Sequence, residues 1–180
     1  MKATGIVRRI DDLGRVVIPK EIRRTMRIRE GDPLEIYTSK DGEVIFKKYS
    51  LMGDLEDLAE QFCEALSKNA GLAAAICDRD TVIAVSGGGK RELIEKRISP
   101  DIEKLLEDRK TYTHAKSERC VFVTDGNDKY FALIAAPVLT EGDVMGCVLF
   151  IADSEEQRAG ETEIKLAQTA AAFLGKHMES

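Results

Sequence analysis

The chain has 180 residues, of which 43% are hydrophobic and 33% charged, and its formal net charge is −5. This length suits one ordinary domain or two small ones, and the balanced composition excludes fibrous, low-complexity and disordered classes. No apolar run approaches the roughly 18–20 residues of a membrane span, and residues 1–5 lack the apolar segment of a signal peptide. We therefore expect a cytoplasmic protein whose cysteines stay reduced.

The charge is distributed unevenly along the chain. Residues 1–50 hold 12 Lys and Arg against 8 Asp and Glu, whereas residues 51–180 hold 15 against 24. Such asymmetry is typical of a nucleic-acid-binding end joined to an acidic end with another role. Charge alone slightly favours an ordinary solvated face, and the motif described below reverses that preference.

Two short strands are expected near the N-terminus. Residues 5–10 and 15–18 are rich in β-branched side chains, and Gly14 can close the turn between them with a positive φ. Pro19 cannot continue a ladder but suits the first turn of a helix, where no N–H is needed.

An amphipathic helix is predicted directly after this proline. Ile18, Ile22 and Met26 recur every four residues and form one apolar stripe. Basic side chains occupy another face, namely Lys20, Arg23, Arg24 and Arg27. The helix would be anchored by its aliphatic side and offer cations to solvent.

A β-hairpin is expected to follow. Residues 34–38 alternate apolar and polar side chains, and residues 43–47 form the return strand after an Asp41-Gly42 turn. Fifty residues with so few large apolar side chains make a poor independent core, and this stretch offers neither cysteines nor a metal-ligand cluster. Dimerisation is the remaining way to stabilise it.

The residues from Thr4 to Pro19, then Arg23-Arg24 and 31–36, together resemble the AbrB/MazE-type swapped-hairpin DNA-binding family. The resemblance implies a mainly β domain with one short helix, in which two chains interleave their hairpins into a small barrel. It also implies double-stranded DNA as a partner, with contacts at Arg8, Arg15, Arg23 and Arg24 and outer candidates at Arg9, Lys20 and Arg27.

Arginine suits both phosphate and guanine recognition. Few aromatic or amide side chains accompany the arginines, so we expect phosphate and shape readout to dominate over a strict base code. Family members often carry Gly at the position of Arg27, so the helix end is expected to lack its usual left-handed cap.

A linking helix is predicted over residues 51–70. Leucine, phenylalanine and alanine recur there with a heptad spacing at Leu51, Leu55, Leu58, Phe62 and Ala65. Two or three heptads do not distinguish a coiled coil with a second copy from a helix packed on its own domain. We favour the coiled coil. The helix could also be the first element of the second domain.

Residues 71–180 read as a second domain of the α+β class with an antiparallel sheet flanked by helices. The expected strands are 72–78, 81–86, 120–124, 130–138 and 144–152, and the expected helices 98–109 and 161–178. This order, together with residues 136–149, resembles a GAF domain. The resemblance implies assembly and small-molecule sensing. The apolar spacing of helix 161–178, like that of 51–69, suggests a tetramer built as a dimer of dimers.

One loop, formed by Gly87, Gly88, Gly89 and Lys90, hints at phosphate binding. A P-loop needs a glycine six residues before its lysine and a Ser or Thr directly after it. Counted from Lys90, these positions hold Ala84 and Arg91, so the P-loop motif is not met. A plain loop is the favoured interpretation, with the lid of a ligand pocket as the alternative.

Other chemistry is weakly indicated. The cysteines, at positions 63, 77, 120 and 147, lack metal-ligand spacing, so we expect neither a metal nor a cofactor. Cys120 follows Glu118-Arg119 and is the one thiol whose neighbours could activate it. His114 and His177 lie far apart in sequence, and no catalytic triad suggests itself, so we do not expect an enzyme.

The favoured hypothesis is a transcription regulator that both activates and represses, and the resemblance links it to sporulation. A ligand of the second domain could shift the spacing of the DNA-binding units through the helix at 51–69. The alternatives are an antitoxin-like interaction protein and, less favoured, a thiol enzyme using Cys120.

Overall fold

The computed structural model describes residues 6–50, 52, 55–116 and 118–179. The chain divides into two compact units, residues 1–49 and residues 50–180, which are described separately. No helix among the described residues combines the length and apolar character needed to cross a bilayer.

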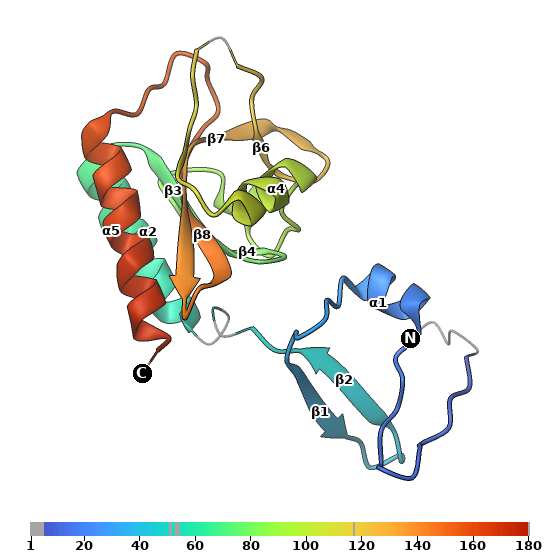
Figure 1. The fold of residues 1–180 in the computed structure, drawn as a ribbon. Helices are drawn as coiled ribbons and strands as arrows, with labels where there is room; N and C mark the ends of the chain where they lie inside the picture. The colour runs from blue at the N-terminus through green and yellow to red at the C-terminus, as the bar shows by residue number, and fades with distance from the viewer. Residues whose placement is uncertain (1–5, 51, 53–54, 117, 180) are drawn as a thin grey trace. The chain divides into compact units, whose positions relative to one another are not determined.

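The N-terminal unit contains one short helix and one hairpin (Figure 1). Helix α1 spans Lys20–Met26, and strands β1 (Leu34–Thr38) and β2 (Val44–Lys48) pair antiparallel. The hairpin closes through the predicted Asp41-Gly42 turn, where Gly42 has φ 81° and the N–H of Ser39 bonds the carbonyl of Glu43 over 3.0 Å. The expected helix and hairpin are thus confirmed. Pro19 lies at the N-cap, one residue before the expected position.

The two expected N-terminal strands are not formed as strands in the single chain. Residues 6–10 and 15–18 have no regular secondary structure, and Gly5 lies outside the described residues. A backbone bond from the N–H of Asp11 to the carbonyl of Arg15 closes the turn between them. A strand needs a ladder with a neighbour, and within the described part of this chain neither segment has one.

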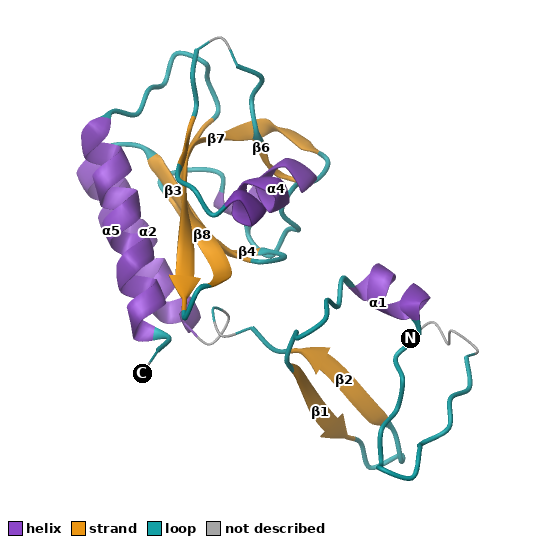
Figure 2. Ribbon diagram, viewed as in Figure 1, coloured by secondary structure: helices purple, strands orange, loops and turns teal. Residues whose placement is uncertain are grey.

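The C-terminal unit is built on a six-stranded sheet in the order β4-β3-β8-β7-β5, with β6 also paired to β7 (Figure 2). The strands are β3 (Ala73–Asp78), β4 (Val82–Ser86), β5 (Tyr112–Thr113), β6 (Phe122–Thr124), β7 (Asn127–Thr140) and β8 (Asp143–Ala152). All of their pairings are antiparallel, as expected. The two-residue β5 was not predicted, because so short a run carries no periodic signal.

Helices cover both faces of this sheet (Figures 1 and 2). Helices α2 (Glu56–Ala70) and α5 (Glu161–His177) lie on one face, and α4 (Pro100–Asp108) lies on the other. A short helix that the sequence did not indicate, α3 (Lys90–Leu93), follows the glycine loop. Separate clusters of buried apolar side chains fill the two faces. The α+β prediction is confirmed.

The predicted seams of α2 and α5 differ in how far they are buried. In α2 the buried residues are Ala59, Cys63 and Leu66, which lie beside the predicted seam rather than on it. Leu58 and Phe62 of the seam are half-buried, Ala65 is exposed, and Leu51 lies outside the described residues. Small side chains bring α2 close to the sheet, so the helix packs on its own domain.

The seam of α5 is buried more completely. Ala167, Ala171 and Leu174 lie in the core of the unit, with Ile164 and Met178 half-buried beside it. A 3-4 spacing is found in any helix with one apolar face. In α5 this spacing reflects packing against the sheet of the same unit.

Candidate nucleic-acid interface

Helix α1 presents the predicted cations on an exposed face. Lys20, Arg23 and Arg24 are all exposed, and their spacing of three and four residues puts them on one side of the helix. Ile22 is half-buried and Met26 is 49% exposed, so the aliphatic stripe has only a partial partner within the described chain. The cations are therefore accessible to a ligand, and the aliphatic stripe is only partly buried within the described chain.

The end of α1 corrects one expectation. Arg27 itself adopts the left-handed conformation, with φ 51° and ψ 38°. The N–H of Ile28 bonds the carbonyl of Arg23 over 2.8 Å, and the N–H of Arg27 bonds that of Arg24 over 3.3 Å. This is the Schellman arrangement. The helix does have its left-handed cap, because the backbone bonds hold a non-glycine residue in it.

The turn between residues 10 and 16 positions a second group of cations. Gly14 has φ 76°, as predicted, and its N–H bonds the carbonyl of Asp11 over 3.0 Å. The carboxylate of Asp11 accepts bonds from the N–H of Leu13 (3.0 Å) and the N–H of Arg15 (2.8 Å). It also accepts the Nε–H of Arg15 over 2.8 Å. Arg15 thus leaves a turn whose shape is fixed by hydrogen bonds.

The remaining predicted contacts are exposed. Arg8 and Arg9 lie in the segment that enters this turn, and both are exposed. In Figure 1 two extended segments flank this turn, and the turn lies at their end that is away from α1. Within one chain the cations therefore form two groups, one on the helix and one around the turn.

The glycine loop is packed closely against its surroundings. A Cβ added at Gly87 would collide with the hydroxyl of Ser67, and one at Gly89 would lie 3.0 Å from the ring of Tyr130. The ammonium of Lys90 pairs with the carboxylate of Glu60 at 2.8 Å. Close packing thus explains Gly87 and Gly89, whereas a Cβ at Gly88 would meet only Ala73 at 3.8 Å. The lysine faces a carboxylate. That this loop forms part of a ligand pocket stays a prediction.

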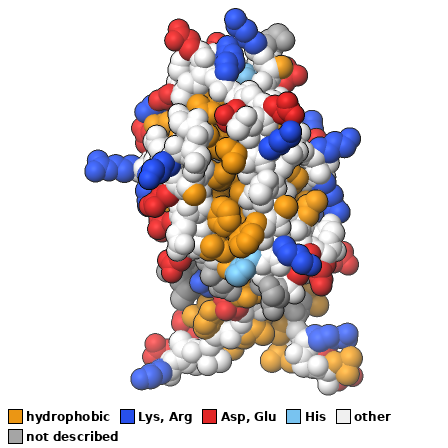
Figure 3. Space-filling model, turned by 90° about the vertical axis from the view of Figure 1, so that its left-hand side faces the viewer, with side chains coloured by type: hydrophobic (Ala, Val, Ile, Leu, Met, Phe, Trp, Pro, Cys, Tyr) orange, Lys and Arg blue, Asp and Glu red, His pale blue; other side chains and the backbone are white. Residues whose placement is uncertain are grey.

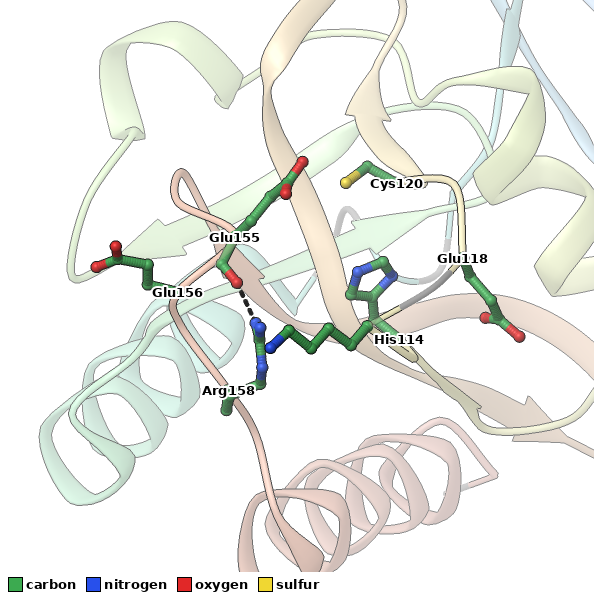
Figure 4. Close-up of a pocket in the computed structure, with 7 residues that line it drawn as sticks. His114, Glu118, Cys120, Glu155, Glu156 and Arg158 are labelled. Atoms are coloured by element: carbon green, nitrogen blue, oxygen red, sulfur yellow. Dashed lines mark hydrogen bonds between the residues drawn. The ribbon is translucent and has the colours of Figure 1, made fainter.

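Sequence reasoning missed a cavity of about 330 Å³ on the C-terminal unit. Its lining residues come from the loops before β6 and after β8, and they are His114, Lys116, Glu118, Cys120, Glu155, Glu156 and Arg158 (Figure 4). A guanidinium nitrogen of Arg158 donates to the carbonyls of Glu155 and Gln157, which orders one wall. Only tertiary folding brings these two loops together, so the sequence contained no local signal for the cavity.

The cysteines differ in their surroundings. Burial raises the pKa of the Cys63 thiol to about 12, with the charge of Glu60 as a second cause. The Sγ atoms of Cys77 and Cys147 lie 3.0 Å apart on paired strands, and this contact, with burial, raises the pKa of Cys147. Cys120 is half-buried and shares the cavity with His114. Among the described residues, no group of three His, Cys, Asp or Glu side chains could hold a metal.

Comparisons with known proteins match both units. A family model described as "Stage V sporulation protein T C-terminal, transcription factor" matches residues 54–179. A second model, "Antidote-toxin recognition MazE, bacterial antitoxin", matches residues 7–51.

Two proteins of Bacillus subtilis (strain 168) are similar in sequence. Stage V sporulation protein T is 48% identical over 179 residues, which is 99% of both chains. The transition state regulatory protein AbrB is 63% identical over 49 residues, which is 27% of this chain and 50% of that protein.

The C-terminal unit also has a solved structural neighbour. The GAF domain of an Acinetobacter phosphoenolpyruvate-protein phosphotransferase superposes with a TM-score of 0.56 at 15% identity, covering 73% of this chain and 84% of that one. At this identity the likeness establishes a GAF-like fold for the unit.

Proposed function

The chain belongs to the stage V sporulation protein T family, and from this premise we propose that it is a transcription regulator that binds double-stranded DNA through its N-terminal unit. The proposal includes a role in sporulation and both activating and repressing effects on transcription. The observation that carries it is the set of exposed cations on α1 and around the turn at residues 11–15.

These cations suit DNA in number and kind. Lys20, Arg23 and Arg24 extend from one helical face, and Arg15 is 69% exposed although its Nε is bonded. A duplex carries one negative charge per about 1.7 Å of its axis, so several exposed cations can each neutralise a phosphate. We assign the DNA contacts to Arg8, Arg9, Arg15, Lys20, Arg23 and Arg24.

A second copy of the chain is proposed to complete the N-terminal unit. Pro19 is the one described residue of this unit that is buried. Six large aliphatic side chains are at least 60% exposed, namely Val7, Ile10, Leu13, Val17, Ile36 and Val44. So much exposed apolar surface on so small a unit marks an interface.

Interleaving of two copies also explains the missing strands. Residues 6–10 and 15–18 have no ladder partner in the single chain, and the equivalent segments of a second copy would supply one. The dimer would double each group of cations and present them with twofold symmetry.

A further pairing is proposed through the helices of the C-terminal unit. Figure 3 shows hydrophobic side chains gathered along the face that α2 and α5 present. Phe173 is 50% exposed, its ring centroid lies 5.2 Å from that of Phe62, and it stacks on His177 at 6.1 Å. Pairing of this face with its copy would join two dimers into a tetramer.

The proposal also includes small-molecule sensing by the C-terminal unit. The cavity of about 330 Å³ has room for a small ligand, and its lining carries both signs of charge. A ligand that binds one tetramer arrangement more tightly would shift the spacing of the DNA-binding units through α2.

Two other functions have specific observations in their favour. The antitoxin model matches residues 7–51, but the structured C-terminal unit and its transcription-factor family favour a regulator. Cys120 and His114 line one cavity, which would suit a thiol enzyme. Unchanged function in a Cys120→Ser variant would dismiss the enzyme.

The proposal is tested by selecting genomic DNA fragments on the purified full chain at several salt concentrations. We expect enriched fragments, and an affinity that falls by about 10³–10⁵ between 50 and 200 mM salt if six to ten phosphates are contacted. An Arg23→Ala/Arg24→Ala variant should bind more weakly with a shallower salt slope.

The matched control is an Arg91→Ala/Arg97→Ala variant, which removes the same charge from exposed positions of the C-terminal unit. It should retain the wild-type slope. Equal losses of DNA affinity in both variants would mean that the effect comes from net charge alone. No enrichment of fragments at any salt concentration would favour the antitoxin-like function.

A further inference from the structure

The carboxylate of Asp11 holds both the turn and the side chain that leaves it. One oxygen, Oδ1, accepts the backbone N–H groups of Leu13 (3.0 Å) and Arg15 (2.8 Å). The other, Oδ2, accepts the Nε–H of Arg15 over 2.8 Å. The two oxygens therefore have separate tasks, one in the backbone of the turn and one on the guanidinium.

The position of this ion pair on the guanidinium matters for recognition. Arginine has five N–H donors, and bidentate contacts to phosphate or guanine commonly use a pair of them. Asp11 engages only Nε, and no other hydrogen bond of the Arg15 side chain occurs within the described residues. The Nη1 and Nη2 groups thus remain available on a side chain that is 69% exposed.

We propose that Asp11 is a positioning residue for DNA recognition, which fixes Arg15 by its Nε so that its two Nη groups meet a guanine edge together. The inference rests on the proposed DNA-binding function and adds a specificity role that the arginines alone do not provide. Preorganisation of this kind lowers the entropic cost of ordering a long side chain on binding.

The charge of Asp11 makes the proposal easy to distinguish from simple electrostatics. A carboxylate near the DNA repels phosphates, so on charge alone its removal should strengthen binding to any duplex. Loss of a positioning contact should instead weaken binding to the preferred sequence. The pKa of Asp11 is lowered, first by the backbone N–H of Arg15 and then by its side chain, so the carboxylate is ionised at neutral pH.

Asp11→Asn separates the two tasks of the side chain. The amide oxygen of Asn can still accept the N–H groups of Leu13 and Arg15, so the turn keeps its cap. The amide has no charge, and its NH₂ group cannot accept from Nε. Asp12→Asn is the matched control, because Asp12 is the exposed neighbouring carboxylate and has no bond to Arg15.

The experiment measures the affinity of the full-length wild type and of both variants for a selected operator and for mixed-sequence DNA of equal length. For Asp12→Asn we expect both affinities to rise together, which leaves their ratio unchanged. For Asp11→Asn we expect the operator-to-mixed ratio to fall about tenfold, within the discrimination that one bidentate contact provides. Thermal unfolding should be alike in the two variants.

A second background tests whether the effect passes through Arg15. In Arg15→Lys the cation is kept but the Nε anchor is lost, so adding Asp11→Asn should leave the ratio unchanged. If Asp11→Asn instead raises both affinities as Asp12→Asn does, or lowers the ratio equally in the Arg15→Lys background, the positioning role is wrong. If the wild type binds no DNA at all, the proposed function fails, and this inference fails with it.

Discussion

At the scale of single residues, Arg27 holds its backbone in a region that costs free energy for any residue with a Cβ. Its φ of 51° and ψ of 38° are imposed by the two bonds that close α1. Its carbonyl also accepts the ammonium of Lys48 over 3.1 Å. The backbone arrangement is therefore held from both sides, which allows a strained residue to persist.

Replacement of Arg27 by glycine should relieve this strain. We expect Arg27→Gly to be more stable than Arg27→Ala by about 1 kcal/mol, because both lose the side chain and only glycine adopts the left-handed region freely. Unfolding in urea at one protein concentration measures the difference. Equal stability of the two variants would mean that the cap carries no strain.

Cys63 links the stability of the C-terminal unit to alkaline pH. Burial raises the pKa of its thiol from 9.0 to about 12. The folded state therefore keeps a proton that the unfolded chain releases above pH 9, so this contribution is complete below pH 9 and is lost as the pH rises toward 12. We expect a loss of roughly 2 kcal/mol from Cys63 between pH 8 and 10.5.

Urea unfolding of the wild type and of Cys63→Ala at both pH values measures this effect. The variant should be less stable at pH 8, because it leaves a small cavity, yet it should lose less stability on going to pH 10.5. Other alkaline groups, including Tyr112, whose pKa burial raises to about 12, act equally in both proteins. Parallel losses in the two proteins would contradict the assignment.

At the scale of elements, the contact between α5 and β7 depends on one glycine. A Cβ on Gly175 would collide with the carbonyl oxygen of Leu139. Gly175→Ala in a helix is normally stabilising by about 0.5–1 kcal/mol. Here we expect the opposite sign, a loss of about 1–3 kcal/mol, because the helix must move away from the sheet.

The exposed position Ala172 in the same helix provides the control. Ala172→Gly should cost about 1 kcal/mol from helix propensity alone. Both variants are compared by thermal unfolding monitored through helical circular dichroism. A stabilised Gly175→Ala variant would show that α5 can shift without cost.

How well each element could be predicted depends on where its partners lie. The strands 130–138 and 144–152 were expected and are confirmed within longer strands, because their apolar runs pair with neighbours of the same chain. The segments at 6–10 and 15–18 carry a strand pattern but have no ladder in one chain. Sequence pattern reports the surface an element can bury, and it does not say which molecule covers it.

The same limit explains the helical seams. The spacing in α2 and α5 correctly predicted amphipathic helices, but the choice between a coiled coil and packing on the sheet needed the sheet itself. For the candidate DNA site, the exposed cations could be located from the motif. The bonds from Asp11 to Arg15 depend on the shape of the turn and required the structure.

At the scale of the whole molecule, assembly is the property on which the proposed regulation depends. The hydrophobic face of α2 and α5 includes Phe62 and Phe173, and Phe173, at 50% exposure, is the most exposed large hydrophobic side chain of the two helices. A charge placed there should prevent two copies from pairing through this face. Because Phe173 is half-exposed, the fold of the unit should survive the change.

We expect Phe173→Glu to convert a tetramer into a dimer, since the proposed dimer of the N-terminal units does not involve α5. Sedimentation velocity measures the change, with circular dichroism to establish that the helices persist. Ala172→Glu adds the same charge at an exposed position on a different side of α5 and should leave the assembly intact. A tetrameric Phe173→Glu variant would place the interface elsewhere. A dimer that still binds a single operator, but no longer bridges two, would tie this face to the spacing of the DNA-binding units.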